Sequence, residues 1–162
     1  MKKKIIYIDM DGVISDFSKA RNEHPLSKQT PYIGRPDRIP NIYKDLDPIT
    51  NSIESVNKII NSDKFDLFFL STPPWDNPDA WTHKRLWIEK YFGNKVRHNE
   101  KYFGNKVKHK LILSARKDLN IGDFLIDDSH RRGQPNFKGE WLEFGSEKFP
   151  NWKSVLSYLE IT

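Results

Sequence analysis

The chain has 162 residues, which is enough for one domain with a sizeable hydrophobic core and a small subdomain beside it. Hydrophobic residues make up 36% of it, charged residues 30% and aromatic residues 13%, a composition that excludes a disordered chain. No apolar run approaches the roughly 18 residues of a membrane span, and the absence of cysteine excludes disulfides and thiolate metal sites. We therefore expect a globular protein of the cytoplasm with no membrane partner.

The chain is basic, with a net charge of +5 and a pI of about 9.3, and this balance has three interpretations. It can belong to a nucleic-acid binder, to an enzyme for anionic substrates, or to a lysine-rich composition without functional meaning. The basic residues are scattered and do not form the stripe with interleaved aromatic residues that a nucleic-acid surface needs. We favour the third interpretation first and small anionic substrates second, and expect no stable complex with nucleic acid.

Short apolar runs rich in β-branched and aromatic residues predict the strands of one sheet. These runs are continuous and do not alternate with polar residues, which is typical of parallel strands covered on both faces. The predicted strands span residues 4–9, 65–71, 110–114 and 123–127, with a short fifth over 141–144.

Apolar residues at helical spacing predict three helices between and after these strands. The first has a capping-box-like start at Asn51 and Glu54, and the second begins at Pro78, a residue favoured in the first turn of a helix. The residues expected on the packed faces are Ile53, Val56, Ile59 and Ile60 in the first helix, Trp81, Arg85 and Ile88 in the second, and Trp152, Val155, Leu156 and Leu159 in the third.

Strands that alternate with helices predict an α/β fold with a doubly wound parallel sheet. Residues 18–49 interrupt this alternation, because they contain five prolines and show little periodicity. A stretch of this length is too long for an ordinary connection. We therefore expect a core formed by residues 1–17 and 50–162, and a small cap over residues 18–49.

A tandem repeat occupies residues 89–110, where EKYFGNKVRHN is followed at once by EKYFGNKVKHK. One such pair is too short for a solenoid, so we interpret it as a local duplication within the core. The first copy can finish the second helix with Gly93 as a left-handed cap, and the second copy leads into the strand at 110–114. The extra residues then leave the core between Gly93 and Val107; a continuous helix is the alternative, disfavoured by Gly93 and Asn94.

Polar side chains follow four of the predicted strands, and ligands bind beyond the carboxyl ends of parallel strands. These residues are Asp9 and Asp11 after the first strand, Ser71 and Thr72 after the second, Lys117 after the third, and Asp127 and Asp128 after the fourth. Each alone is more often turn or capping chemistry than a functional group. Together they form a cluster of carboxylates that needs a cation, and oxygen ligands without His or Cys suit Mg²⁺.

With these residues, the sequence resembles haloacid-dehalogenase-like (HAD) phosphatases, and more closely the 5'(3')-deoxyribonucleotidase family. The similar stretches are YIDMDGVISDF at 7–17, FFLSTP at 68–73, WIEKY at 87–91, LSARKDLN at 113–120 and FLIDD at 124–128. The resemblance implies a Rossmann-like HAD core with a cap inserted after the first strand. It also implies a Mg²⁺-dependent hydrolase that removes phosphate from deoxyribonucleoside monophosphates, in deoxyribonucleotide catabolism.

The resemblance implies covalent catalysis that divides one difficult step into two easier ones. Asp9 would attack phosphorus, and Asp11 would protonate the leaving oxygen and then activate water. The metal set would be the Asp9 carboxylate, the Asp11 backbone carbonyl and Asp128, with Asp127 in support. The roles fit the physical chemistry, since Mg²⁺ favours an ionised Asp9 and a general acid must carry a proton.

The resemblance likewise assigns Ser71, the Thr72 N–H and Lys117 to the phosphate oxygens. Phe17 matches the aromatic residue on which the base stacks in the family, although a packing role in a helix fits it nearly as well. Tyr32 and Tyr43 are further candidates for this pocket. The base preference stays open, and so does a homodimer.

Two other functions are consistent with the same residues. One is a phosphatase of this fold that acts on 3'-phosphate ends of polynucleotides or on another small phosphate ester. The other is a catalytically inactive nucleotide-binding module, against which stands the presence of a competent residue at every expected catalytic position.

Overall fold

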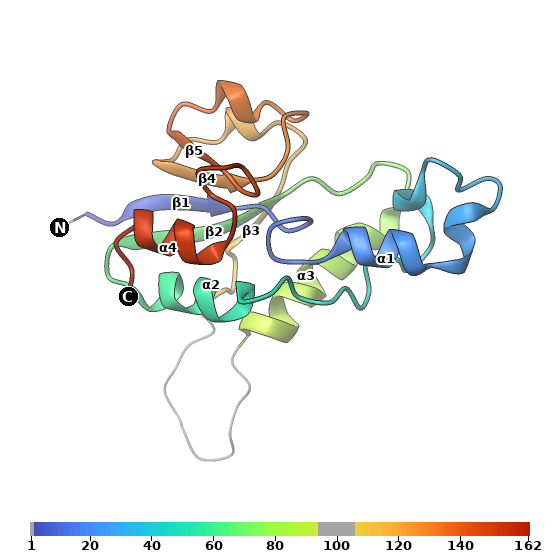
Figure 1. Cartoon of the computed structure of the whole chain (residues 1–162), viewed down its shortest axis with the longest axis horizontal. Coiled ribbons are helices and arrows are strands. Elements are labelled where there is room, and N and C mark those ends of the chain that lie inside the picture. The colour runs from blue at the N-terminus through green and yellow to red at the C-terminus, as the bar shows by residue number, and fades with distance from the viewer. Residues whose placement is uncertain (1, 94–105) are drawn as a thin grey trace, which may run out of the picture.

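The computed structural model describes residues 2–93 and 106–162, and these form one sheet with helices packed against it (Figure 1). The sheet of the described chain has five strands, all parallel, in the order β3-β2-β1-β4-β5. They are β1 (Lys4–Ile8), β2 (Phe65–Ser71), β3 (Leu111–Leu113), β4 (Phe124–Asp127) and β5 (Glu140–Glu143). The predicted α/β class and the five predicted strands are confirmed; the second has the predicted bounds, and the ends of the others differ from the prediction by one residue.

The pairing of the strands aligns their carboxyl ends at one edge of the sheet. Ile6 of β1 lies opposite Leu67 of β2 and Phe124 of β4. Two hydrogen bonds continue the ladder past the strand ends, because the Asp9 N–H donates to Ile126 O at 2.9 Å and the Ser114 N–H to Ser71 O at 2.9 Å. The polar residues that follow the strands therefore meet at this edge.

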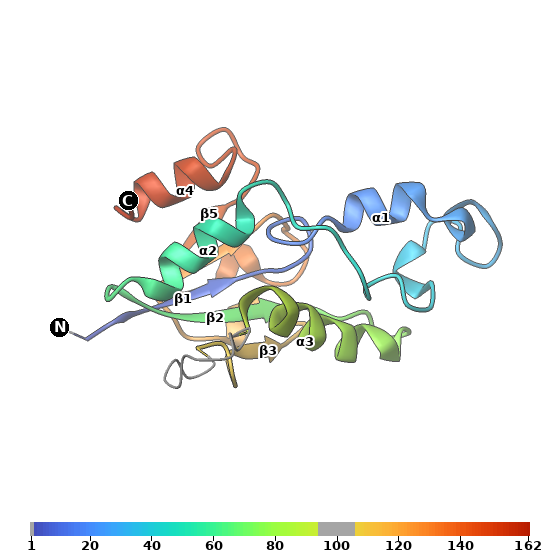
Figure 2. The same ribbon diagram turned by 90° about the horizontal axis from the view of Figure 1, so that it is seen from below.

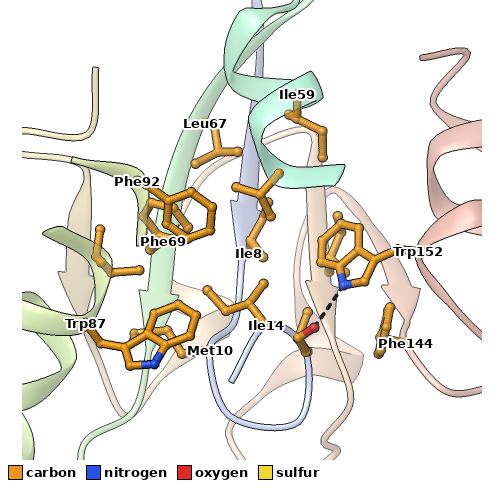
Figure 3. Close-up of a cluster of buried hydrophobic side chains, with 14 of the residues drawn as sticks. Ile8, Met10, Ile14, Ile59, Leu67, Phe69, Trp87, Phe92, Phe144 and Trp152 are labelled. Atoms are coloured by element: carbon orange, nitrogen blue, oxygen red, sulfur yellow. Dashed lines mark hydrogen bonds between the residues drawn. The ribbon is translucent and has the colours of Figure 1, made fainter. Parts of the chain in front are cut away.

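The described chain has four α-helices: α1 (Phe17–Glu23), α2 (Ser52–Asn61), α3 (Pro78–Phe92) and α4 (Trp152–Tyr158). The last three lie on one face of the sheet, as the two views show together (Figures 1 and 2). Their apolar side chains form the main core with β1 and β2 (Figure 3). None of the helices in the described residues combines the length and the apolarity that crossing a bilayer requires.

The opposite face of the sheet is covered by short 3₁₀ turns and loops. A small cluster of Tyr7, Leu70, Leu125 and Phe137 fills this side. The turns Lys117–Leu119 and Gln134–Asn136 follow β3 and β4, where a larger doubly wound protein would place crossover helices. Connections therefore cross both faces of the sheet, but within residues 2–93 and 106–162 the α-helices that pack on it lie on one face.

The start of α2 and the buried face of α3 differ from the prediction. Asn51 adopts a left-handed conformation (φ 63°) that turns the chain into α2, and its side chain makes no capping hydrogen bond, so the expected capping box does not form. In α3 the buried face is rotated by one position from the predicted one, because Trp81 is 40% exposed and Arg85 points to solvent. Ile88 is buried as predicted, and the other buried residues of this helix are Ala80, Lys84, Trp87 and Phe92.

The segment 18–49 contains most of α1 and two 3₁₀ turns, Pro25–Lys28 and Pro36–Arg38. It extends beyond the carboxyl edge of the sheet, next to the start of α3 (Figures 1 and 2). Its later part is anchored in the main core through Ile39, Ile42, Tyr43 and Leu46.

The first copy of the repeat ends α3 at Phe92, as predicted, and the chain does not continue as a helix through Gly93. Gly93 is extended (φ −65°, ψ 144°), so the predicted left-handed cap is wrong. The reason for a glycine is space, because an added Cβ would lie 2.3 Å from Glu89 O, which accepts the Gly93 N–H at 2.9 Å. The predicted excursion between Gly93 and Val107 lies largely in residues 94–105, outside the described residues.

Candidate active site

The loop after β1 folds tightly around the carbonyl of Met10, which accepts the N–H groups of Ile14 at 2.8 Å and Ser15 at 2.9 Å. Trp152 of α4 pins the loop by donating its indole N–H to Val13 O at 3.0 Å, the bond drawn in Figure 3. Gly12 has a positive φ of 83°, and an added Cβ there would lie 2.1 Å from a carboxylate oxygen of Asp128. Glycine at this position therefore lets the loops after β1 and β4 approach each other.

Lys117 lies between two carboxylates at the strand ends. Its ammonium is 2.6 Å from Asp9 Oδ1 and 3.0 Å from Asp127 Oδ2, and it also donates to Leu70 O. Burial alone would lower the pKa of Lys117, whose exposure is 1%, but the charges of Asp9 and Asp127 outweigh it and raise the pKa. The lysine is thus held as a cation that partly neutralises the acidic cluster.

The carboxylates at the end of β4, Asp127 in the strand and Asp128 after it, differ in their surroundings. Asp127 is fully buried, and its Oδ1 accepts the Ser129 N–H and the Gln134 side-chain amide, both at 2.9 Å. Burial, followed by the nearby charge of Asp9, raises the pKa of Asp127 to about 6 and that of Asp128 to about 7. Both carboxyls therefore resist ionisation unless further positive charge is near.

Asp9, Asp127 and Asp128 could hold a metal ion. Each offers one carboxylate oxygen, and these three atoms lie within 4.8 Å of one another. Lys117 pairs with two of these carboxylates, Asp9 and Asp127, so a divalent cation would complete the charge balance of the three. The all-oxygen donor set fits a hard cation.

Asp11 is engaged through both of its carboxylate oxygens. Ser15 Oγ donates to Oδ1 at 3.1 Å, and the Lys84 ammonium forms an ion pair with Oδ2. Lys84 is 1% exposed and lies over the Tyr43 ring, 4.8 Å from its centroid.

The sequence prediction missed Lys84. The available signal was its position four residues after Ala80 and three before Trp87, on the apolar face of α3. A lysine on such a face is rarely buried without an anionic partner. Gln134, which orients Asp127, was also missed, because nothing in its local sequence separates it from an ordinary loop residue.

Ser71, the last residue of β2, and Thr72, which follows it, have different local partners. Ser71 is 1% exposed, and its hydroxyl has no hydrogen-bond partner among the described residues. The Thr72 hydroxyl donates to Ser114 O at 2.7 Å and so ties the loop after β2 to the loop after β3. The predicted phosphate-binding residues Ser71, Thr72 and Lys117 thus lie on neighbouring strand ends.

Phe17 begins α1 and stacks on Tyr43, with ring centroids 4.9 Å apart and planes 4° from parallel. Tyr43 is buried; burial, then the charges of Asp11 and Asp37, raises the pKa of its hydroxyl. One face of the half-buried Phe17 ring is therefore occupied by Tyr43. Tyr32 packs against the edge of the main core.

Comparison with known proteins gives a consistent set of relatives. The sequence is 40% identical over 157 residues to a Vibrio phage KVP40 protein assigned as a 5'(3')-deoxyribonucleotidase, covering 97% of this chain and 85% of the phage protein. It is 24% identical over 179 residues to the human cytosolic 5'(3')-deoxyribonucleotidase, covering 93% and 78%. A Bordetella bronchiseptica protein with the same assignment is 25% identical over 148 residues, covering 76% and 73%. No protein-family model matches the sequence.

Proposed function

Because the chain belongs to the 5'(3')-deoxyribonucleotidase family and is a phosphoric monoester hydrolase, we propose that it dephosphorylates deoxyribonucleoside monophosphates with Asp9 as the nucleophile. One observation carries the proposal: the Asp9 carboxylate is held at the end of β1 by Lys117, beside Asp127 and Asp128. The contact with Lys117 fixes the carboxylate in place at the strand end, where one of its oxygens can attack phosphorus.

The reaction would take two steps. A carboxylate oxygen of Asp9 attacks phosphorus, the bond from phosphorus to the ester oxygen breaks, and Asp11 gives its proton to that oxygen, which leaves as the nucleoside hydroxyl. Asp11, now a carboxylate, takes a proton from a water molecule whose oxygen attacks the phosphorus. The bond to Asp9 then breaks, which releases inorganic phosphate and returns both residues to their starting states.

Mg²⁺ would be held by the carboxylates of Asp9 and Asp128 and by the backbone carbonyl of Asp11, with Asp127 in support. The Asp11 side chain is committed to Ser15 and Lys84, which leaves its carbonyl as the atom it can offer. When bound, the ion would supply positive charge against the phosphate oxygens and the carboxylates. Mg²⁺ fits this site because the carboxylate oxygens of Asp9, Asp127 and Asp128 lie close to one another.

The phosphate oxygens would be held by the Ser71 hydroxyl, the Thr72 N–H and the Lys117 ammonium. The buried Ser71 hydroxyl supports this role, since it lacks a hydrogen-bond partner among the described residues. The Thr72 hydroxyl is already committed to Ser114, so its backbone N–H is the group that remains. Donors fixed in advance stabilise charge that develops on the phosphoryl oxygens.

We place the nucleoside under a cap formed by residues 18–49, with its base on the ring face of Phe17 that Tyr43 does not cover. The stack of Phe17 on Tyr43 supports this, because it holds Phe17 rigidly beside the first catalytic loop. The cytoplasm is the compartment proposed for the reaction.

A substrate panel tests the proposal. Phosphate release should be measured for the 5'- and 3'-monophosphates of thymidine, for deoxyuridine 5'-monophosphate, for deoxyribose 5-phosphate and for a 3'-phosphorylated oligonucleotide, with Mg²⁺ and with chelator. We expect kcat/KM to be highest for the nucleotides and activity to vanish in chelator. A preference for the oligonucleotide, or equal activity in chelator, would contradict the proposal.

A further inference from the structure

Lys84 is buried in the middle of α3 although none of the strand-end motifs includes it. In the described part of the chain, it and Lys117 are the buried lysines, each 1% exposed. An ammonium group removed from water destabilises the protein unless it is paired. The partner of Lys84 is the Asp11 carboxylate, so the helix supplies a cation to the loop after β1.

The position of Lys84 is fixed from several sides. The ammonium lies 4.8 Å from the centroid of the Tyr43 ring, a cation–π contact with the segment before α2. Three residues further along α3, Trp87 donates its indole N–H to Leu46 O at 2.8 Å. Before the first turn, the Asn77 side-chain amide donates to Asp37 O and Ile39 O at 2.9 and 3.0 Å. The helix is therefore tied to residues 37–46 along its length.

This anchored ammonium fixes the Asp11 side chain, because Ser15 holds Oδ1 and Lys84 holds Oδ2. A side chain bound at both oxygens cannot rotate freely about its χ angles. We infer that Lys84 is a positioning residue that acts through Asp11: it orients this carboxyl for proton transfer to the leaving oxygen and pairs with the carboxylate that remains once the proton has left. The inference rests on the proposed role of Asp11 as general acid and base.

The dependence of the rate on the leaving group distinguishes this positioning role from direct binding of the phosphoryl oxygens by Lys84. Proton transfer matters most when the leaving group is a poor one, such as a nucleoside hydroxyl, and little when it is a stable phenolate. A lysine that acted on the phosphoryl oxygens would affect both kinds of ester alike, since they share the phosphoryl group. In both cases kcat/KM reports the steps up to release of the leaving group.

The experiment compares thymidine 5'-monophosphate with 4-nitrophenyl phosphate at saturating Mg²⁺. For Lys84→Met, which removes the charge at similar volume, we expect kcat/KM to fall about 10²-fold on the nucleotide and less than about 3-fold on the aryl ester. Lys84→Arg, which keeps a cation, should recover part of the loss. Arg85→Met, on the exposed side of the same helix, is the matched control and should behave as wild type.

A double-mutant cycle completes the test. In an Asp11→Asn background, Lys84→Met should cause little further loss on the nucleotide, because the residue it positions is gone. Equal losses on both esters, or a full additional loss in that background, would overturn the inference. Wild-type activity on the aryl ester but not on nucleotides would instead refute the proposed substrate, and glycerol 2-phosphate would then serve as the alkyl ester. If Lys84→Met does not fold, Lys84→Gln carries the same comparison.

Discussion

The loop after β3 and the middle of α3 each bring a buried lysine to the site, and the two regions hold their lysines differently. Lys117 is surrounded by Asp9, Asp127 and a backbone carbonyl, so it neutralises the acidic cluster where phosphate and metal would bind. Lys84 contacts one carboxylate, that of Asp11, and one aromatic ring, that of Tyr43. Asp11 is the residue proposed to transfer protons. In the proposed mechanism the first region balances charge around phosphorus and the second orients the proton donor, so disruption of each should have different consequences.

The largest effect should come from the proposed nucleophile Asp9, the carboxylate that Lys117 of the first region contacts. Asp9→Asn should lower kcat by at least about 10³-fold, because an amide cannot attack phosphorus. The fold should persist, since Lys117 keeps Asp127 as a partner. Kinetics with saturating Mg²⁺ and melting temperature check both parts, with the surface variant Asp63→Asn as control. Retention of more than a small fraction of kcat would exclude the covalent mechanism.

Lys117→Met sharpens the comparison with Lys84→Met. We expect kcat/KM to fall about 10²- to 10³-fold on nucleotides and aryl phosphates alike, because the lost cation faces the group that both esters share. The melting temperature should also fall, since Asp9 and Asp127 would be left buried without their common partner, a change that costs on the order of 3 kcal/mol or more. An effect confined to nucleotides would show that the two regions do not differ in this way.

Phe17→Ala probes the proposed stacking of the nucleotide base beside the loop after β1. Stacking a base on an aromatic side chain is worth about 1–3 kcal/mol, so kcat/KM for nucleotides should fall about ten- to hundredfold. The value for deoxyribose 5-phosphate, which has no base, should not change, and this substrate serves as the control. A parallel loss on both substrates would mean that Phe17 only packs against Tyr43.

The acidic cluster should make the stability of the metal-free protein depend on pH. The folded-state pKa values of about 6 for Asp127 and about 7 for Asp128 lie above the ordinary value of 3.8. Their contribution to stability is therefore full below about pH 4 and is lost as the pH rises through 6 and 7. In chelator, the melting temperature should be higher at pH 5 than at pH 8, and Asp128→Asn should flatten the difference. A higher melting temperature at pH 8 would contradict the assignment.

The smallest effect should come from the repeat, which belongs to neither region. Deletion of residues 89–99 leaves one copy to finish α3 and lead into β3. Activity and melting temperature should stay near those of the intact chain. An insoluble or inactive product would show that both copies are needed for the fold.

The difference between the two regions also explains what could be predicted from the sequence. Strand ends are fixed by the register of a parallel sheet, so the cluster around Asp9 and Lys117 follows from the order of apolar runs. The buried face of a helix depends on which residues form its apolar row. An error of one residue in that choice rotates the predicted face by about 100°. The predicted stripe therefore placed Arg85 where Lys84 lies.

The remaining errors have the same origin in tertiary structure. Asn51 and Gly93 both have the residue type expected at a helix end, yet the chain path around them selects other conformations. The contact of Gln134 with Asp127 depends on how a loop folds back, which no local pattern reports.

The stereochemistry of phosphoryl transfer tests the central assignment of Asp9 most directly. A nucleoside phosphorothioate made chiral with ¹⁶O and ¹⁸O can be hydrolysed in ¹⁷O-water, and the configuration of the released thiophosphate determined. Attack by Asp9 followed by attack of water inverts phosphorus twice, so the account predicts overall retention. Overall inversion would mean that water attacks the substrate directly, and Asp9 would then not be the nucleophile.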